Sequence, residues 1–416
     1  MTGLQQPTAK GLSQEILREA ARRFGTPCWV YDADEIRRRV ATLKSFGVIR
    51  YAQKANSNTH LLRLLRELGV VVDAVSLGEI ERALVAGYHG HHHNDIVYAS
   101  DILEPAALAR IVELGIPVNI GSPQMLSQLG QASPGHSVWL RINPGFGSGF
   151  SRKTNTGGEW SKHGLWHEQL DECYEMIRTY RLKLVGLHMH IGSGADFNQL
   201  GRVCDAMVAQ VRKCPFDIEA ISAGGGLPIP YRESDRDVDI NAYHDRWAAA
   251  RATIEAHLGH AVTLEIEPGR YIVGNAGYLV SEVRAHKAVG PNMFVLTDAG
   301  FNDLVRPAMY GSYHRIEILS EEESPRCSTI VAGPLCEAGD VFTQDSGGVI
   351  VPQDLPVASV GDLAVFHDCG AYSASMSSNY NTRGLAPEIL FDAGTLRLVR
   401  RRQLAADLLG LEAFDD

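Results

Sequence analysis

Lys54 is the first residue whose type and position point to chemistry. It directly follows the candidate strand Arg50–Gln53. A lysine shielded from water at a strand end loses its charge more readily, and its amine can then form a Schiff base with a carbonyl compound. The alternative is an ordinary surface lysine, and Lys54 taken alone does not decide between the two.

Two glycine-rich segments follow later candidate strands. One is His188–Gly194, which contains His190 and Ser193, and the other is Gly224–Pro228. Glycine lets backbone N–H groups approach an anion, and a serine hydroxyl adds a donor, so a phosphate site and a pair of plain turns both remain open. His188 and His190 lie on the same strand face, as two metal ligands would. The alternative is that one imidazole packs against an aromatic cofactor.

An acid and a guanidinium, Glu267 and Arg270, follow the last candidate strand of this series. The acid could keep a bound pyridine ring protonated, and the planar guanidinium suits a phosphate or carboxylate. The alternative is a structural ion pair between the two side chains.

Three later segments combine glycine with polar and ionisable residues, which is typical of binding-site loops. They are Asp298–Tyr310, Gly333–Asp340 and Gly370–Asn381. In the second segment, Cys336 stands beside Glu337 and could donate a proton, whereas a buried, inert thiol is the alternative.

The elements that must position these residues alternate between strands and amphipathic helices. The eight candidate strands are Arg50–Gln53, Val70–Ala74, Ile96–Ala99, Pro117–Ile120, Val138–Ile142, Leu184–Met189, Ile218–Ala223 and Val262–Ile266. Eight βα units over roughly 250 residues predict a (β/α)8 TIM-like barrel, whose active groups lie at the carboxyl ends of its strands. The tract His89–His93 precedes a strand, so we interpret it as a solvated loop away from that face.

After about Gly277 helical periodicity fades, which predicts a C-terminal β-rich domain of sandwich or barrel-like form. The apolar segment Pro27–Tyr31 is β-prone and is expected to add an N-terminal strand to that domain. The predicted domains are therefore an N-terminal segment (1–35), a barrel (36–277) and a β-rich domain (278–416).

Composition narrows the classes of function. The 416 residues are 45% hydrophobic and 21% charged, and the net charge of −10 argues against a general binder of nucleic acid or membrane surfaces. The seven cysteines form no CxxC pair, which fits free thiols in a reducing compartment. Neither an apolar signal core nor a run of about 20 apolar residues is present, so a cytoplasmic location is expected.

Taken in order, the motifs resemble those of fold-type III pyridoxal-phosphate-dependent decarboxylases, and among these the diaminopimelate decarboxylase family. They are YAQKAN, VSLGE, HMHIGSG, GGGLP, EPGR, DAGFNDLVRPAMY, GPLCEAGD and GAYSASMSSNYN, and they cover nearly the whole chain. Two departures are small: His163 stands where the family often has an aromatic residue, and the segment 382–387 replaces the common Ser-Arg-Pro pattern.

The resemblance implies decarboxylation of meso-2,6-diaminopimelate to L-lysine, with pyridoxal 5'-phosphate held on Lys54 and a proton donated by Cys336. It implies that His190 stacks on the pyridine ring and that Glu267 pairs with the ring nitrogen. The implied cofactor-binding residues are Lys54, His190, Ser193, Gly225, Gly226, Glu267, Pro268, Gly269, Arg270 and Tyr372. The implied substrate-binding residues are Arg270, Arg306, Tyr310, Glu337 and Tyr372.

The resemblance also implies a homodimer with shared active sites. No metal, nucleic-acid or membrane partner is expected from the residues themselves. A related decarboxylase of ornithine, arginine or lysine is one alternative. An amino-acid racemase is a second, and a cofactor-binding protein without catalysis is a third.

Overall fold

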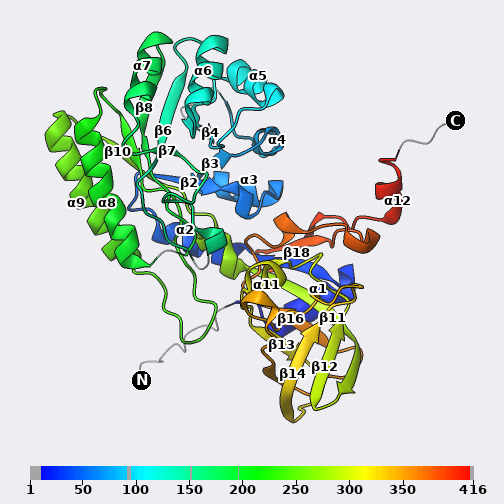
Figure 1. The fold of residues 1–416 in the computed structure, drawn as a ribbon. Coiled ribbons are helices and arrows are strands. Elements are labelled where there is room, and N and C mark those ends of the chain that lie inside the picture. Colours follow the sequence, from blue (N-terminus) through cyan, green and yellow to red (C-terminus); the bar gives the residue numbers. More distant parts are fainter. Residues whose placement is uncertain (1–10, 91–94, 150–151, 195, 413–416) are drawn as a thin grey trace, which may run out of the picture. The chain divides into compact units, whose positions relative to one another are not determined.

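The computed structural model describes residues 11–90, 95–149, 152–194 and 196–412. The chain forms two compact units (Figure 1). One unit, here called the barrel unit, comprises residues 37–272. The other, here called the β unit, combines the N-terminal segment up to Ile36 with the chain from Val273 onward.

Eight parallel strands close the barrel unit into a ring. In ring order they are β2 (Val48–Ala52), β3 (Val71–Ala74), β4 (Ile96–Tyr98), β5 (Val118–Ile120), β6 (Ser137–Asn143), β8 (Lys183–His188), β9 (Ala220–Ser222) and β10 (Thr263–Ile266). The ring closes because β10 pairs with β2. The two-residue strand β7 (Leu165–Trp166) pairs with the end of β6. All eight predicted strands are confirmed.

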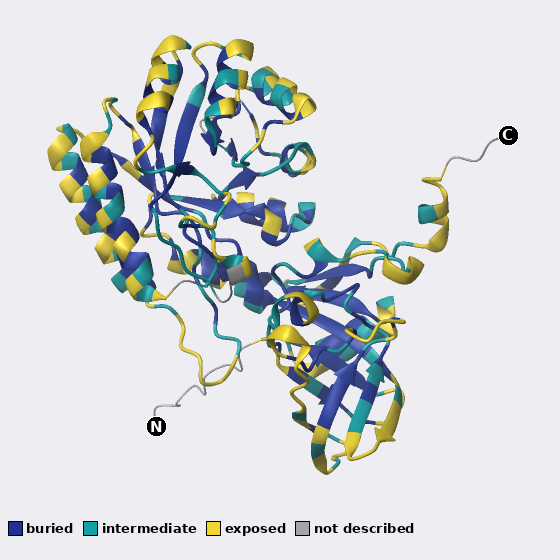
Figure 2. Cartoon of the chain, in the orientation of Figure 1, coloured by how far each residue is buried: buried dark blue, intermediate teal, exposed yellow. Residues whose placement is uncertain are grey.

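Helices follow the strands around the ring. They are α3 (Thr59–Glu67), α4 (Leu77–Val85), α5 (Pro105–Leu114), α6 (Pro123–Ala132), α7 (Asp171–Thr179), α8 (Phe197–Lys213), α9 (Ile240–Leu258) and the short α10 (Arg270–Val273), with α2 (Ala33–Thr42) before β2. The ring strands are almost wholly buried, whereas α8 and α9 alternate buried and exposed positions (Figure 2). Parallel strands covered by helices read as continuous apolar runs for this reason.

The VSLGE motif forms the start of α4. The Ser76 hydroxyl accepts a hydrogen bond from the Glu79 N–H (3.2 Å), and the Glu79 carboxylate accepts one from the Val75 N–H (2.8 Å). These reciprocal bonds are a variant of a capping box, which satisfies donors that a helix start leaves open. The motif therefore has a structural role at the end of β3, the neighbour of the strand β2 that precedes Lys54.

A nine-stranded sheet forms the β unit. Its strands are β1 (Cys28–Asp32), β11 (Gly277–Val289), β12 (Asn292–Thr297), β13 (Ile316–Leu319), β14 (Arg326–Ala332), β15 (Gln353–Pro356), β16 (Leu363–Phe366), β17 (Glu388–Asp392) and β18 (Thr395–Arg400). Its helices are α1 (Gln14–Phe24), α11 (Arg306–Tyr310) and α12 (Ala405–Leu409).

The N-terminal strand β1 lies between two strands from the other end of the chain. It pairs antiparallel with β11 and parallel with β17. Its apolar face joins a core with Leu17, Val280 and Ile389. The predicted fold class, a barrel plus a β-rich domain that takes in an N-terminal strand, is confirmed. Among the described residues, no helix combines the length and apolar character needed to cross a bilayer.

Candidate active site

Lys54 lies in a single 3-10 turn, Gln53–Ala55, directly after β2. Its side chain is exposed although both neighbours are buried. Asp73, at the end of the adjacent strand β3, accepts a hydrogen bond from the Gln53 N–H (3.2 Å). Burial raises the pKa of Asp73 to about 8, and the opposite charge of Lys54 acts against that rise. The amine is thus accessible at the carboxyl end of the barrel, beside a buried acid.

His190 belongs to the first glycine segment and contacts the second. The Gly225 N–H donates to its Nδ1 (3.2 Å), and the Gly194 N–H donates to the Gly226 carbonyl (3.0 Å). Burial, with help from the charge of Lys54, lowers the pKa of His190 well below its usual value. His190 is therefore a neutral, flat ring held by one edge, as stacking on an aromatic cofactor requires.

The glycine turn after β9 approaches its neighbours too closely for side chains. A Cβ on Gly225 would lie 2.4 Å from the Glu267 carbonyl oxygen and 3.6 Å from His190 Cε1. Gly226 has a φ of +98°, and a Cβ there would lie 2.3 Å from the Gly192 carbonyl oxygen. Only glycine permits this close backbone approach.

Glu267 follows β10 and is held by side chains from the two preceding strands of the ring. The Nε2 of His188 lies 2.8 Å from its Oε2, and the Ser222 hydroxyl donates to its Oε1 (3.0 Å). Burial opposes ionisation of this carboxyl, but His188 and the nearby Arg50 guanidinium outweigh burial and lower its pKa to about 2. Glu267 is consequently an ionised carboxylate inside the barrel.

Arg270 is buried and donates to two hydroxyl groups. Its Nη2 donates to Ser193 Oγ (3.0 Å), and its Nη1 donates to the Tyr231 hydroxyl. The preceding residues tie this segment to that of Lys54: the Pro268 carbonyl accepts from the Ala52 N–H (3.2 Å), and a Cβ on Gly269 would lie 3.1 Å from the Ala55 side chain. The EPGR and YAQKAN motifs thus pack directly against each other.

These barrel residues form one cluster that fits a pyridoxal phosphate group. It offers the exposed amine of Lys54, the neutral imidazole of His190 and the ionised carboxylate of Glu267. It also offers the guanidinium of Arg270 and the hydroxyl of Ser193, and its glycine turn lies too close to its neighbours for any side chain. The carboxylate meets the need of a pyridine nitrogen for an acidic partner. The guanidinium and the hydroxyl meet the needs of a phosphate.

The predicted residues of the β unit form a second cluster of loops. Asp340 organises it, because its carboxylate accepts from the Phe301 N–H (2.7 Å) and the Leu335 N–H (2.8 Å). The Cys336 N–H donates to Asn381 Oδ1 (3.0 Å). These bonds join the three polar segments predicted from the sequence.

Within this second cluster the side chains differ in exposure. Cys336 and Glu337 are exposed, so the alternative of a buried, inert thiol does not hold for Cys336. Arg306 is buried at the start of α11, donates to Ser312 Oγ (3.1 Å) and lies 5.9 Å from the centroid of the Tyr310 ring. Tyr372 is half-buried and has a φ of +55°, a conformation that a non-glycine residue adopts at a cost.

Four contacts were not predicted from the sequence: those of His188 and Ser222 with Glu267, of Tyr231 with Arg270, and of Asp73 with the Lys54 turn. Asp73 did leave a signal, since it interrupts an otherwise apolar strand. The partners of Glu267 follow from register, because His188 pairs with Ser222 across β8 and β9. No local pattern marks Tyr231.

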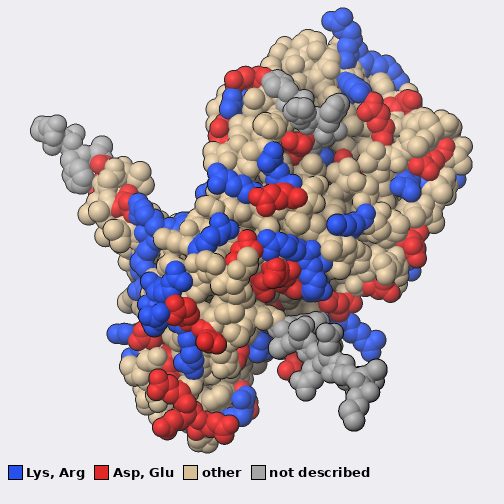
Figure 3. Space-filling view, turned by 180° about the vertical axis from the view of Figure 1, so that it is seen from behind, with Lys and Arg blue, Asp and Glu red and all other residues tan. Residues whose placement is uncertain are grey.

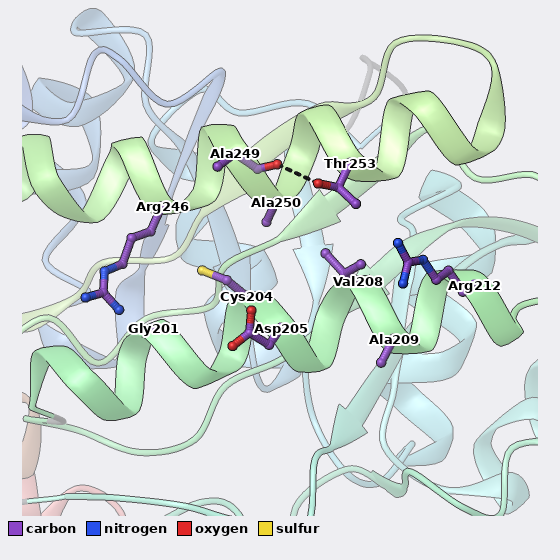
Figure 4. Close-up of a pocket in the computed structure, with 10 residues that line it drawn as sticks. All are labelled: Gly201, Cys204, Asp205, Val208, Ala209, Arg212, Arg246, Ala249, Ala250 and Thr253. Carbon is purple, nitrogen blue, oxygen red and sulfur yellow. Dashed lines mark hydrogen bonds between the residues drawn. The ribbon is translucent and has the colours of Figure 1, made fainter.

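Two other features do not make a site for this chemistry. A groove of about 530 Å³ lies between α8 and α9, lined by residues such as Cys204, Asp205 and Arg246, and it contains none of the predicted site residues (Figure 4). Within the described part of the chain, no three His, Cys, Asp or Glu side chains are placed to hold a metal ion. Residues 91–94 of the histidine tract lie outside the described residues.

Comparison with known proteins agrees with this geometry. The model of the family "Pyridoxal-dependent decarboxylase, pyridoxal binding domain" matches residues 33–274. The chain is 60% identical to a diaminopimelate decarboxylase of Streptomyces coelicolor, over 95% of this chain and 91% of that protein. It is 57% identical to one of Escherichia coli K12, over 97% and 98%.

Solved structures give the same result. A crystal structure of a diaminopimelate decarboxylase superposes with a TM-score of 0.93 at 58% identity, covering 96% of each chain. The diaminopimelate decarboxylase of Helicobacter pylori, crystallised with L-lysine, superposes with a TM-score of 0.85 at 29% identity, covering 95% of this chain and 98% of that one. The chain therefore belongs to the diaminopimelate decarboxylase family of pyridoxal-dependent decarboxylases.

Proposed function

We propose that this chain removes CO2 from meso-2,6-diaminopimelate to give L-lysine, using pyridoxal 5'-phosphate, as the last step of lysine biosynthesis. The observation that carries the chemistry is the ionised Glu267 carboxylate inside the barrel, in one cluster with the accessible Lys54 amine. The choice of substrate rests on relatives of this name at 57–60% identity over nearly the full chain.

When bound, the pyridoxal group supplies a sink for the electrons of the broken Cα–carboxylate bond. Lys54 supplies the amine that anchors the group and later releases the product. Glu267 keeps a proton on the pyridine nitrogen, and His190 holds the ring by one face. Arg270 and Ser193, with the backbone of Gly225 and Gly226, bind the phosphate, and Pro268, Gly269 and Tyr372 complete its surroundings.

The magnitudes separate binding from catalysis. Enzymes lower barriers by about 8–23 kcal/mol, whereas one charge-assisted hydrogen bond contributes about 1.5–3 kcal/mol net. The phosphate contacts therefore position the group and do not account for the rate. Cys336 delivers the proton that replaces CO2 at Cα, a role that its exposed thiol in a loop fixed by Asn381 supports.

The far end of the substrate carries a second amino and carboxylate group. Arg306 suits that carboxylate and Glu337 suits that ammonium group, with Tyr310, Tyr372 and Arg270 as further contacts. We propose that the barrel domain (36–277) binds the cofactor and that the β-rich domain (278–416) completes the active site of a partner in a homodimer. The exposure of Cys336 and Glu337 in the single chain supports this arrangement.

We also propose a cytoplasmic location without nucleic-acid or membrane partners. On the face that Figure 3 shows, Lys and Arg side chains are interspersed with Asp and Glu. Such a mixture supports a small-molecule substrate, because a protein that tracks phosphates concentrates positive charge.

A panel of amino acids with CO2 release as the readout tests the function. We expect release from meso-diaminopimelate and little from L-ornithine, L-arginine or L-lysine. Chiral analysis should find L-lysine as the product. Preferred release from ornithine, arginine or lysine would favour a related decarboxylase, a change of configuration without CO2 would favour a racemase, and cofactor binding without either reaction would favour a non-catalytic protein.

A further inference from the structure

His188 contacts Glu267 but belongs to none of the roles assigned above. We propose that His188 is a positioning residue: it donates its Nε2 proton to Glu267, and with Ser222 it fixes the carboxylate in place for the pyridine nitrogen. The inference rests on the proposed cofactor chemistry and extends it to a residue that does not touch the reacting atoms.

The tautomer of His188 follows from its two nitrogen atoms. Glu267 is ionised and can only accept hydrogen bonds, so the nitrogen 2.8 Å from its Oε2 must carry a proton. The other nitrogen, Nδ1, is buried and finds no hydrogen-bond partner among the described residues. A proton on Nδ1 would be a buried donor without a partner, which costs free energy, so Nε2 is the nitrogen that donates in this contact.

Ser222 holds the other oxygen of the same carboxylate. Its hydroxyl donates to Glu267 Oε1 (3.0 Å) and accepts from the Gly224 N–H (3.1 Å). One donor on each oxygen fixes the plane of the carboxylate, and each oxygen keeps a further lone pair for another donor. The link to Gly224 also fixes that plane relative to the glycine turn proposed to bind the phosphate.

The charges around Glu267 support a carboxylate that is not yet neutralised. Two buried guanidinium groups interact with it electrostatically, those of Arg50 and Arg141. Arg50 donates to both oxygens of Glu265 (2.9 and 3.2 Å), and Arg141 lies 4.0 Å from Asp101. Each cation therefore has a carboxylate of its own. The negative charge of Glu267 is therefore one that a protonated pyridine ring would balance.

Substitutions at position 188 separate the hydrogen bond from the bulk of the ring. In His188→Gln the amide nitrogen can occupy the place of Nε2 and donate to Glu267, whereas His188→Met fills similar volume without a donor. The protonation of the ring nitrogen is read by ¹⁵N NMR of the holoenzyme with ¹⁵N-labelled pyridoxal phosphate. Cofactor affinity is measured by rebinding to the cofactor-free protein, and kcat and KM are measured for meso-diaminopimelate.

We expect His188→Met to lower the pKa of the ring nitrogen by about one unit and kcat about tenfold, the ratio that one net hydrogen bond provides. KM should stay within about twofold, since His188 does not contact the substrate. His188→Gln should recover most of both losses. Ser222→Ala should shift the ring-nitrogen signal in the same direction as His188→Met.

His136 provides the matched control. It is buried, its Nε2 lies 2.7 Å from the Ile116 carbonyl oxygen, and it precedes β6 at the opposite end of the barrel strands. His136→Met should lower the melting temperature and leave the ring-nitrogen signal unchanged. A wild-type ring-nitrogen signal in His188→Met, or a His188→Gln protein no better than His188→Met, would overturn the proposal. The NMR signal needs no substrate, so it tests His188 even if meso-diaminopimelate is not the substrate.

Discussion

Removing Arg50 should destabilise the barrel strongly. Arg50 and Glu265 lie on the adjacent strands β2 and β10, and their side chains are 1% and 5% exposed. Arg50 donates to both Glu265 oxygens and also to the Val72 carbonyl (3.1 Å). Arg50→Met would leave the Glu265 carboxylate buried without its cation. Breaking one side of a buried pair typically costs about 3–5 kcal/mol.

Urea unfolding of the cofactor-free protein measures this cost. Trp29 is the one tryptophan of the five that lies outside residues 37–272. In a Trp29→Phe background, fluorescence therefore reports on the barrel unit alone, chiefly through the buried Trp139 and Trp247. With a denaturant slope of about 3 kcal/mol per molar, the expected loss lowers the midpoint by roughly 1–1.7 M.

Two further variants make the interpretation specific. Arg50→Met combined with Glu265→Leu removes both charges and should regain most of the lost stability, because a buried pair is replaceable by apolar groups. The exposed pair Lys183–Glu219 (2.7 Å) is the control, and Lys183→Met should change stability by about 0–1 kcal/mol. A midpoint of Arg50→Met within about 0.3 M of its parent, or a double variant no more stable than the single one, would refute the reasoning.

Four further predictions concern the proposed site. Lys54→Ala should lose borohydride-fixable attachment of the cofactor, and a fixed adduct or full turnover would remove Lys54 from its role. Cys336→Ala should lower kcat by about 10²–10⁴-fold with an unchanged cofactor spectrum, and unchanged turnover would exclude Cys336. Asp340→Asn weakens the acceptor of two loop N–H groups, so KM should rise about tenfold while cofactor affinity stays constant; a loss of affinity instead would contradict the division between the two clusters. The pKa of Glu267 is lowered from 4.5 to about 2. The contribution of its ionised form to the stability of the folded protein is therefore complete above pH 4.5 and is lost only as the pH falls toward 2. The decline of kcat at acidic pH should therefore occur at the same pH in the wild type and in the residual activity of Glu267→Gln. A decline at a different pH in Glu267→Gln would contradict this assignment.

The barrel was largely predictable because its strands are buried on both faces. Such strands read as short apolar runs between helices, so the ends that carry Lys54, Ser193 and Glu267 could be placed. The β unit was predicted less completely. Several of its strands are short or partly exposed and leave a weak pattern, as in β18, where buried Leu396 stands among exposed residues.

The contacts of the site depended on register and not on local pattern. His188 meets Glu267 because β8, β9 and β10 are consecutive in the ring, and sequence spacing does not reveal that order. Tyr231 reaches Arg270 from an irregular loop, whose path the sequence does not determine locally. Motifs singled out the candidate residues, but the partners of these residues required the structure.

The place of β1 in the sheet bears on how the chain matures on the ribosome. Its partners β11 and β17 begin at Gly277 and Glu388, and buried Tyr31 donates to Glu388 (2.5 Å). At 5–20 residues per second, the last of these partners is synthesised roughly 20–70 s after β1. The apolar strand CWVYD has neither partner until β11 is made after the complete barrel sequence, and it lacks the second until β17 is made. Nascent chains should therefore need shielding of this one segment until synthesis is nearly finished.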